Sequence, residues 1–236
     1  MARVTMGRPT FVADPRHGPL PALLLALTFV AGLVDALSIL GAGRVFVANM
    51  TGNVVFIGFA LAGIEGFGLL SSVVAVAGFV AGALGGGTLA QRFGTSRPLL
   101  LRNALGIEFV LLAGCLVVSL IVDLRHGGPV PATVVAGVAA TAMGLQTATA
   151  RRIGVPDMTT RVVTMTLTGF AADHSRTDAA LRRGAVVLSM LLGALCGALL
   201  AVNLGSHTGF VAVLVVVGGV GITAGLLARH EKPWHA

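Results

Sequence analysis

Long apolar runs dominate the pattern of hydrophobic and polar positions along this chain. A helix needs about 20 predominantly apolar residues to cross a bilayer, and six runs reach that length. The pattern therefore predicts six membrane-spanning helices, which cover residues 20–40, 67–90, 98–122, 130–150, 184–204 and 208–228. Residues 1–19 and 229–236 are polar, and we expect both tails to lie outside the membrane.

Two polar interruptions break this pattern, one in each half. The first is Asn49-Met50-Thr51-Gly52-Asn53, which follows a glycine-rich stretch and precedes the apolar run 54–62. We expect extended backbone, then a cap at Asn49 or Thr51, then a helix of about three turns. The second interruption covers residues 151–161 and is followed by another short apolar run. Non-helical backbone at membrane depth must be buried in protein or line a wet cavity.

The second half of the chain repeats the first. Residues 32–36 align with residues 144–148 at an offset of 112, and residues 82–94 align with residues 193–205 at an offset of 111. Seven of the thirteen positions in the longer block are identical. The close agreement of the two offsets predicts two structural repeats joined by a short linker. The first repeat, the linker and the second repeat cover residues 20–122, 123–129 and 130–228.

The positions of the basic residues favour inverted repeats. If each short apolar run dips into the membrane and returns, fourteen of the sixteen Lys and Arg residues lie on the side of the N-terminus. If the short runs cross, only nine of the sixteen do. The positive-inside rule prefers the first arrangement, with both tails in the cytoplasm. We therefore expect an all-α polytopic membrane protein of two inverted repeats, each with three transmembrane helices and one re-entrant half-helix. Eight crossing segments in parallel repeats are the alternative.

Inverted repeats would bring the N-termini of the two half-helices together near the middle of the membrane. A helix N-terminus carries a partial positive charge and N–H donors without partners, so this arrangement favours a polar or anionic solute. The candidate substrate-binding residues are Asn49, Thr51, Gly52, Asn53, Gln146, Thr159 and Thr160. The alternative is that these side chains only cap helices and satisfy buried backbone groups.

Two carboxylates lie deep in the predicted spans, Asp35 in the first and Glu108 near the middle of the third. An ionised carboxylate is costly there, so each must be neutral, paired or facing water. One interpretation is proton coupling, in which the carboxyl group takes up and releases a proton during transport. The other is structural, in which the group hydrogen-bonds to the broken backbone that follows Asp35. Glu108 is the better candidate for coupling because it is nearer the centre of its span.

Glycines at four-residue spacing mark one face of the second span and one face of the fifth. They are Gly78, Gly82, Gly86, Gly193 and Gly197. Small residues at this spacing let two helix backbones approach closely. We expect the second span to pack against the fifth, with a homodimer interface as the alternative.

Composition supports a membrane protein and narrows its function. Hydrophobic residues make up 56% of the chain and charged residues 11%, and the mean hydropathy is +0.94. The net charge of +7 is explained by arginines in the loops between spans, so we expect no nucleic-acid partner. Cys115 and Cys196 fall within predicted spans without a ligand cluster, and the usual catalytic motifs are missing from the sequence. We expect no metal, no cofactor and no enzymatic activity.

These motifs together resemble the YoaK-like family of uncharacterised bacterial membrane proteins (domain of unknown function 1275). The residues that carry the resemblance are Gly32-Leu33-Val34-Asp35-Ala36, Met50-Thr51-Gly52-Asn53, Gly144-Leu145-Gln146, Arg151-Arg152 and Thr159-Thr160. The resemblance covers roughly residues 20–228 and implies a small integral protein of the bacterial inner membrane. Where members commonly have Thr-Gly-Asn or Thr-Gly-Thr in the second half, this chain has Met165 in place of the glycine.

We expect the protein to be a proton-coupled secondary transporter for a small polar or anionic solute, with the lipid bilayer as its other partner. A passive channel on the same plan is the first alternative. The second is a membrane scaffold or partner subunit, in which the polar groups inside the spans only stabilise the fold.

Overall fold

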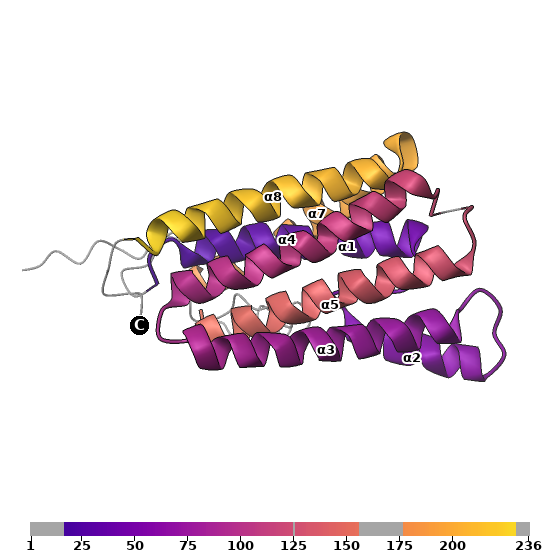
Figure 1. The fold of residues 1–236 in the computed structure, drawn as a ribbon, viewed down its shortest axis with the longest axis horizontal. Coiled ribbons are helices and arrows are strands. Elements are labelled where there is room, and N and C mark those ends of the chain that lie inside the picture. Colours follow the sequence, from indigo (N-terminus) through magenta and orange to yellow (C-terminus); the bar gives the residue numbers. More distant parts are fainter. Residues whose placement is uncertain (1–16, 125, 156–176, 230–236) are drawn as a thin grey trace, which may run out of the picture.

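The computed structural model of the protein describes residues 17–124, 126–155 and 177–229. These residues form seven α-helices and contain no β-strand (Figure 1). The helices are α1 (Leu20–Gly41), α2 (Met50–Leu61), α3 (Leu69–Phe93), α4 (Arg97–Ile121), α5 (Pro129–Ile153), α7 (Thr177–Leu204) and α8 (Ser206–Leu227). Six of them, all but α2, are long and apolar enough to cross a membrane. The described part of the chain is therefore all-helical with six candidate membrane spans, as the hydropathy pattern predicts.

One helix begins well before the apolar pattern predicts. α7 begins at Thr177 rather than near residue 184, whereas α2 begins at Met50, directly after Asn49, one of the two predicted cap positions. Hydropathy marks where apolar surface begins, whereas a helix continues as far as its residues favour helical backbone. The first turns of α7 contain Ala, Leu and Arg, which are among the strongest helix formers.

Glycines set the closest helix packing, and the partners differ from the prediction. α3 packs along α5, and α1 packs along α7. A Cβ atom at Gly82 would overlap the backbone of Thr141 on α5, and one at Gly193 would overlap the backbone of Phe29 on α1. The predicted packing of the second span against the fifth, which are α3 and α7, is therefore wrong.

The other glycines of the two predicted faces follow the same pairing. Gly78 and Gly86 face α5, and Gly197 faces α1. Each partner helix supplies a glycine of its own at the contact, Gly144 on α5 and Gly32 on α1. Glycine spacing indicates that some helix comes close, but the identity of that helix depends on small residues on both surfaces. Gly32 and Gly144 are the first residues of the shorter pair of aligned sequence blocks. Their equivalence in the two repeats was the sequence signal for the helices that pack against the glycine faces.

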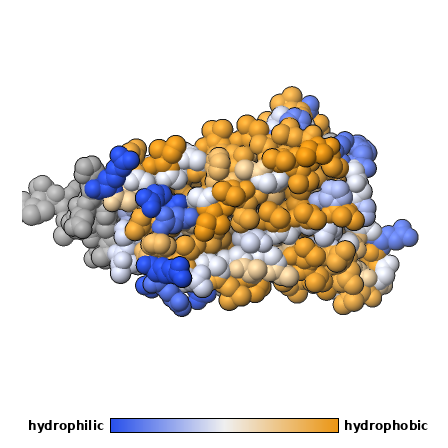
Figure 2. Space-filling view, in the orientation of Figure 1, coloured by the Kyte–Doolittle hydropathy of each residue, from blue (hydrophilic) through white to orange (hydrophobic). Residues whose placement is uncertain are grey.

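The long helices run the length of the molecule and end at two opposite ends (Figure 1). The α3–α4 turn and the last turns of α5 and α8 lie at one end, which we call the basic end. The arginines of the described residues at this end include Arg92, Arg97, Arg102, Arg151, Arg152 and Arg229. The α4–α5 and α7–α8 connections lie at the other end, with the last turn of α1, the helix α2 and the first turn of α3. Figure 2 shows hydrophobic side chains over the middle of one face and hydrophilic ones toward its ends.

Candidate functional site

The chain leaves its helical course between α1 and α2, at residues 42–49. Asp35, which is buried near the end of α1, accepts two hydrogen bonds at Oδ1, each 2.8 Å long, from the backbone N–H groups of Val47 and Ala48. These donors have no partner in a helix or sheet, and a carboxylate oxygen can satisfy both. Asp35 therefore holds the broken backbone in place, as the structural interpretation expects, and its role in proton coupling stays a prediction.

Asn53 anchors the same segment from the first turn of α2. Its Oδ1 accepts from the backbone N–H of Phe46 at 2.8 Å, and its Nδ2 donates to the carbonyl oxygen of Phe46 at 2.6 Å. The side chain of Asn53 is fully buried. Both ends of the carboxamide are thus used to bind the backbone of one residue, so a solute would have to displace these bonds to contact it.

The predicted side-chain cap of the short helix is not formed. Asn49 occupies the N-cap position of α2, but no side-chain hydrogen bond caps the helix. Its backbone, at φ −110° and ψ 79°, lies short of the extended region in which an N-cap side chain faces the first turn. Asn49 and Thr51 are both exposed at this N-terminus, so their polar groups remain accessible beside the N–H groups of the first turn.

An aromatic cluster packs around α2. The ring of Phe46 lies over Gly52, where a Cβ atom would come 2.5 Å from its Cδ2 atom. Phe46 also stacks on Phe56, with ring centroids 5.7 Å apart, and Phe67 lies 4.9 Å from Phe56 and 5.1 Å from Phe59. Gly52, a predicted solute-binding residue, therefore allows a close approach of Phe46 to the helix.

Glu108 lies near the middle of α4 in a different environment. Its side chain is 0% exposed, and neither carboxyl oxygen has a hydrogen-bond partner among the described residues. It stands eleven residues after Arg97, which places it about 16 Å along the helix. A carboxyl group without a partner at this depth is expensive in a membrane, and such groups usually mark a path for ions or solutes.

Other buried polar groups lie at different depths in the helices. Gln146 on α5 donates from Nε2 to the carbonyl oxygen of Leu27 on α1 at 3.2 Å, while its Oε1 has no partner among the described residues. The sequence analysis missed three buried hydroxyl groups that also lack a partner there. They belong to Ser38 on α1, Ser72 on α3 and Thr149 on α5. A single hydroxyl in an apolar helix gives little sequence signal, although Thr149 is one turn from Gln146.

Residues 156–161 of the second polar interruption, which include Thr159 and Thr160, lie outside the residues that the structure describes. Within the described residues, no group of three or more His, Cys, Asp and Glu side chains could hold a metal ion. The described residues therefore combine a break after α1 that is held by hydrogen bonds, an exposed polar helix N-terminus and buried polar groups without described partners.

Comparison with known proteins identifies the family. The profile of the family described as "Protein of unknown function (DUF1275)" matches residues 23–224, so the chain belongs to this family. The UPF0700 transmembrane protein YoaK of Bacillus subtilis (strain 168) is 30% identical over 154 residues. That alignment covers 65% of this chain and 66% of YoaK, just under two thirds of the relative's length. No solved structure matches the chain. With six apolar helices of spanning length among the described residues, the chain is a multi-pass membrane protein.

Proposed function

We propose that this member of the DUF1275 family is a secondary transporter that couples proton movement to the movement of a small polar or anionic solute. The observation that carries the proposal is Glu108, a fully buried carboxyl group without a partner among the described residues. A fold gains no stability from such a group, because burial removes it from water and nothing replaces the lost hydrogen bonds. A group that must take up and release a proton needs this freedom.

Two inverted repeats are the architecture we propose for the transporter. In the two repeats, α1 corresponds to α5, α3 to α7 and α4 to α8. Under this correspondence the contact of α1 with α7 is equivalent to the contact of α5 with α3, and the contact of α4 with α8 is equivalent to itself. The same correspondence relates the α4–α5 contact to the α8–α1 contact. In Figure 1, α1 starts at the basic end whereas α5 finishes there, so the two equivalent helices run in opposite directions. Inverted repeats of this kind are typical of secondary transporters.

The short helix α2 fits a re-entrant half-helix better than a crossing one. Its 12 residues span about 18 Å, against about 30 Å for the apolar core of a bilayer. α1 ends and α3 begins at the same end of the molecule, so α2 returns to the side from which the chain came. The hydrogen bonds that Val47 and Ala48 donate to Asp35 hold these two residues beside α1, at about 9 Å from its end. The alternative of eight crossings gains no support from these observations.

The basic end is proposed to face the cytoplasm of the inner membrane, because cytoplasmic loops carry the excess of arginine. Both tails would then be cytoplasmic. In this orientation α2 and the exposed residues Asn49 and Thr51 are reached from the opposite face. We propose that these two residues, with the N–H groups of the first turn of α2, contact the solute on one side of its binding site. Gln146 and residues 159–160 are proposed to contact it on the other side.

The direct test is proton movement in liposomes that contain the full chain and a trapped pH-indicator dye. A panel of small carboxylates, inorganic phosphate and neutral amino acids is added outside, one at a time. The wild-type protein is expected to acidify or alkalinise the lumen with at least one member of the panel, and Glu108→Gln is expected to abolish that change. A passive channel would keep its solute flux in Glu108→Gln. A scaffold would move no member of the panel in either protein, and that result would overturn the proposal.

A further inference from the structure

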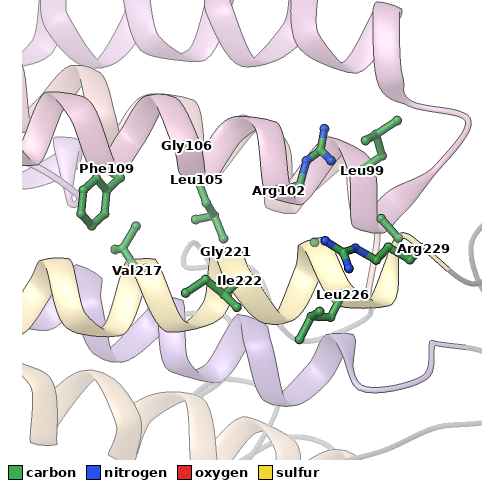
Figure 3. Close-up of a pocket in the computed structure, with 13 residues that line it drawn as sticks. Leu99, Arg102, Leu105, Gly106, Phe109, Val217, Gly221, Ile222, Leu226 and Arg229 are labelled. Atoms are coloured by element: carbon green, nitrogen blue, oxygen red, sulfur yellow. The ribbon is translucent and has the colours of Figure 1, made fainter.

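An apolar groove with a basic mouth runs between α4 and α8 at the basic end (Figure 3). Its volume is 550 Å³, within the range of about 300–1,000 Å³ that is usual for small-molecule sites. In Figure 3 the side chains of Arg102 and Arg229 lie toward one end of the groove and that of Phe109 lies toward the other. The groove is thus polar at one end and apolar along the rest of its length.

Glycines on both helices create the groove. A Cβ atom at Gly106 on α4 would meet no atom within 4 Å, and one at Gly221 on α8 would meet only Leu105 Cβ, at 3.6 Å. Side chains that would normally fill the space between two packed helices are therefore missing here. On the rim of the groove, Ile222 is 67% exposed and Leu226 is 54% exposed. Such apolar side chains on the outside of a membrane-spanning helix face lipid, so the groove opens toward the bilayer.

The two arginines lie near helix ends at the basic end of the groove. Arg102 lies in the second turn of α4, and Arg229 lies two residues beyond the end of α8. The stem of Arg102 runs beside Gly225, where a Cβ atom would come 3.3 Å from its Cδ atom, so the guanidinium group can extend toward the membrane surface. Arg102 bonds the uncharged side chain of Asn103, and within the described residues neither arginine has a carboxylate partner.

We propose that this groove binds an anionic glycerophospholipid, with one acyl chain along the glycine-lined wall and the phosphate between Arg102 and Arg229. Arginine pairs phosphate oxygens through several N–H groups at once, and basic pockets between membrane helices on the cytoplasmic side bind anionic headgroups. The assignment to the cytoplasmic leaflet rests on the proposed orientation. The site itself does not depend on transport, so the two proposals can fail separately.

Native mass spectrometry of the detergent-solubilised full chain gives the first measurement, because it needs no variant. Phosphatidylglycerol is expected to bind at least tenfold more tightly than phosphatidylcholine with the same acyl chains. Glycerol 3-phosphate, which has the phosphate but no acyl chain, is expected not to compete. Equal binding of the two lipids, or competition by glycerol 3-phosphate, would overturn the proposal.

Variants then locate the site. The double change Arg102→Gln with Arg229→Gln and the single change Gly106→Leu, which fills the groove, are each expected to weaken phosphatidylglycerol binding tenfold or more. The double change Arg92→Gln with Arg151→Gln is the matched charge control, since both arginines are exposed at the basic end outside the groove. Gly114→Leu is the matched filling control, because a Cβ atom there also meets no atom within 4 Å.

Each variant is first compared with the wild type by size-exclusion chromatography and circular dichroism. If a control variant loses as much affinity for phosphatidylglycerol as the groove variant to which it is matched, the proposed lipid site is refuted. A change of oligomeric state in Gly106→Leu without a change in lipid binding would also refute it, and would identify the groove as a contact between copies of the chain.

Discussion

Asp35 and Glu108 are both buried carboxyl groups in candidate membrane spans, but their surroundings differ. Asp35 accepts two backbone hydrogen bonds at 2.8 Å and joins α1 to the broken segment. Glu108 has no hydrogen-bond partner among the described residues. Burial is the same for both, so burial alone does not reveal a role. The hydrogen-bond partners distinguish them: Oδ1 of Asp35 binds the backbone after α1 although its Oδ2 has no described partner, whereas both carboxyl oxygens of Glu108 lack one. We propose that this leaves Glu108 free to exchange a proton.

Asp35→Ala is expected to have the largest effect on stability. It leaves two N–H groups without an acceptor, at about 1–3 kcal/mol each, so the free energy of unfolding should fall by about 2–6 kcal/mol. The measurement is reversible unfolding in mixed detergent micelles, followed by circular dichroism. Asp35→Asn, which keeps an oxygen at the same place, serves as the control and should recover most of the loss. A wild-type unfolding curve for Asp35→Ala would mean that these bonds do not brace the segment.

Asn53→Ala is expected to have the next largest effect. The backbone N–H and carbonyl groups of Phe46 both lose their side-chain partner, and the free energy of unfolding should fall by about 2–3 kcal/mol. The same unfolding assay measures it. Thr51→Ala, at an exposed position two residues away, is the control and should change stability by less than about 0.5 kcal/mol. Equal losses in the two variants would remove the distinction between a buried anchor and an accessible polar group.

Glu108→Gln is expected to have the smallest effect on stability and the largest on activity. No hydrogen bond to a described residue is lost, so the free energy of unfolding should change by less than about 1 kcal/mol. Proton movement in the liposome assay should nevertheless disappear. A large loss of stability instead would place Glu108 with Asp35, as a group that the fold needs, and the contrast between the two regions would collapse.

Much of the architecture was readable from the sequence because membrane spans obey a simple rule of length and hydropathy. The break after α1 was also predictable, since residues 41–48, which include Gly41 and Gly43, form a stretch too glycine-rich and too short for a good helix. Hydrogen bonding between that segment and Asp35 was one of two open interpretations, and the structure shows two N–H groups of the segment donating to Asp35. The side-chain cap by Asn49 was wrong because capping depends on a backbone angle that composition does not determine.

The partners of the glycine faces could not be found in the same way. Gly82 and Gly193 lie on α3 and α7, which bind α5 and α1 rather than each other. Four-residue spacing is a property of one helix, but a contact is a property of two. The buried hydroxyl of Thr149 and the groove between α4 and α8 were missed for a related reason, since each depends on which helices become neighbours.

The amino-acid sequence by itself determined that this chain is an all-helical membrane protein with six long spans, a short helix after the first and an acid before the break. Local composition decides these features because the bilayer requires each span to satisfy its own backbone hydrogen bonds. Only the tertiary structure decided which carboxyl group is anchored, which glycines meet and where a groove stays open. Those outcomes depend on contacts between segments far apart in the chain, where packing of both surfaces sets the free energy.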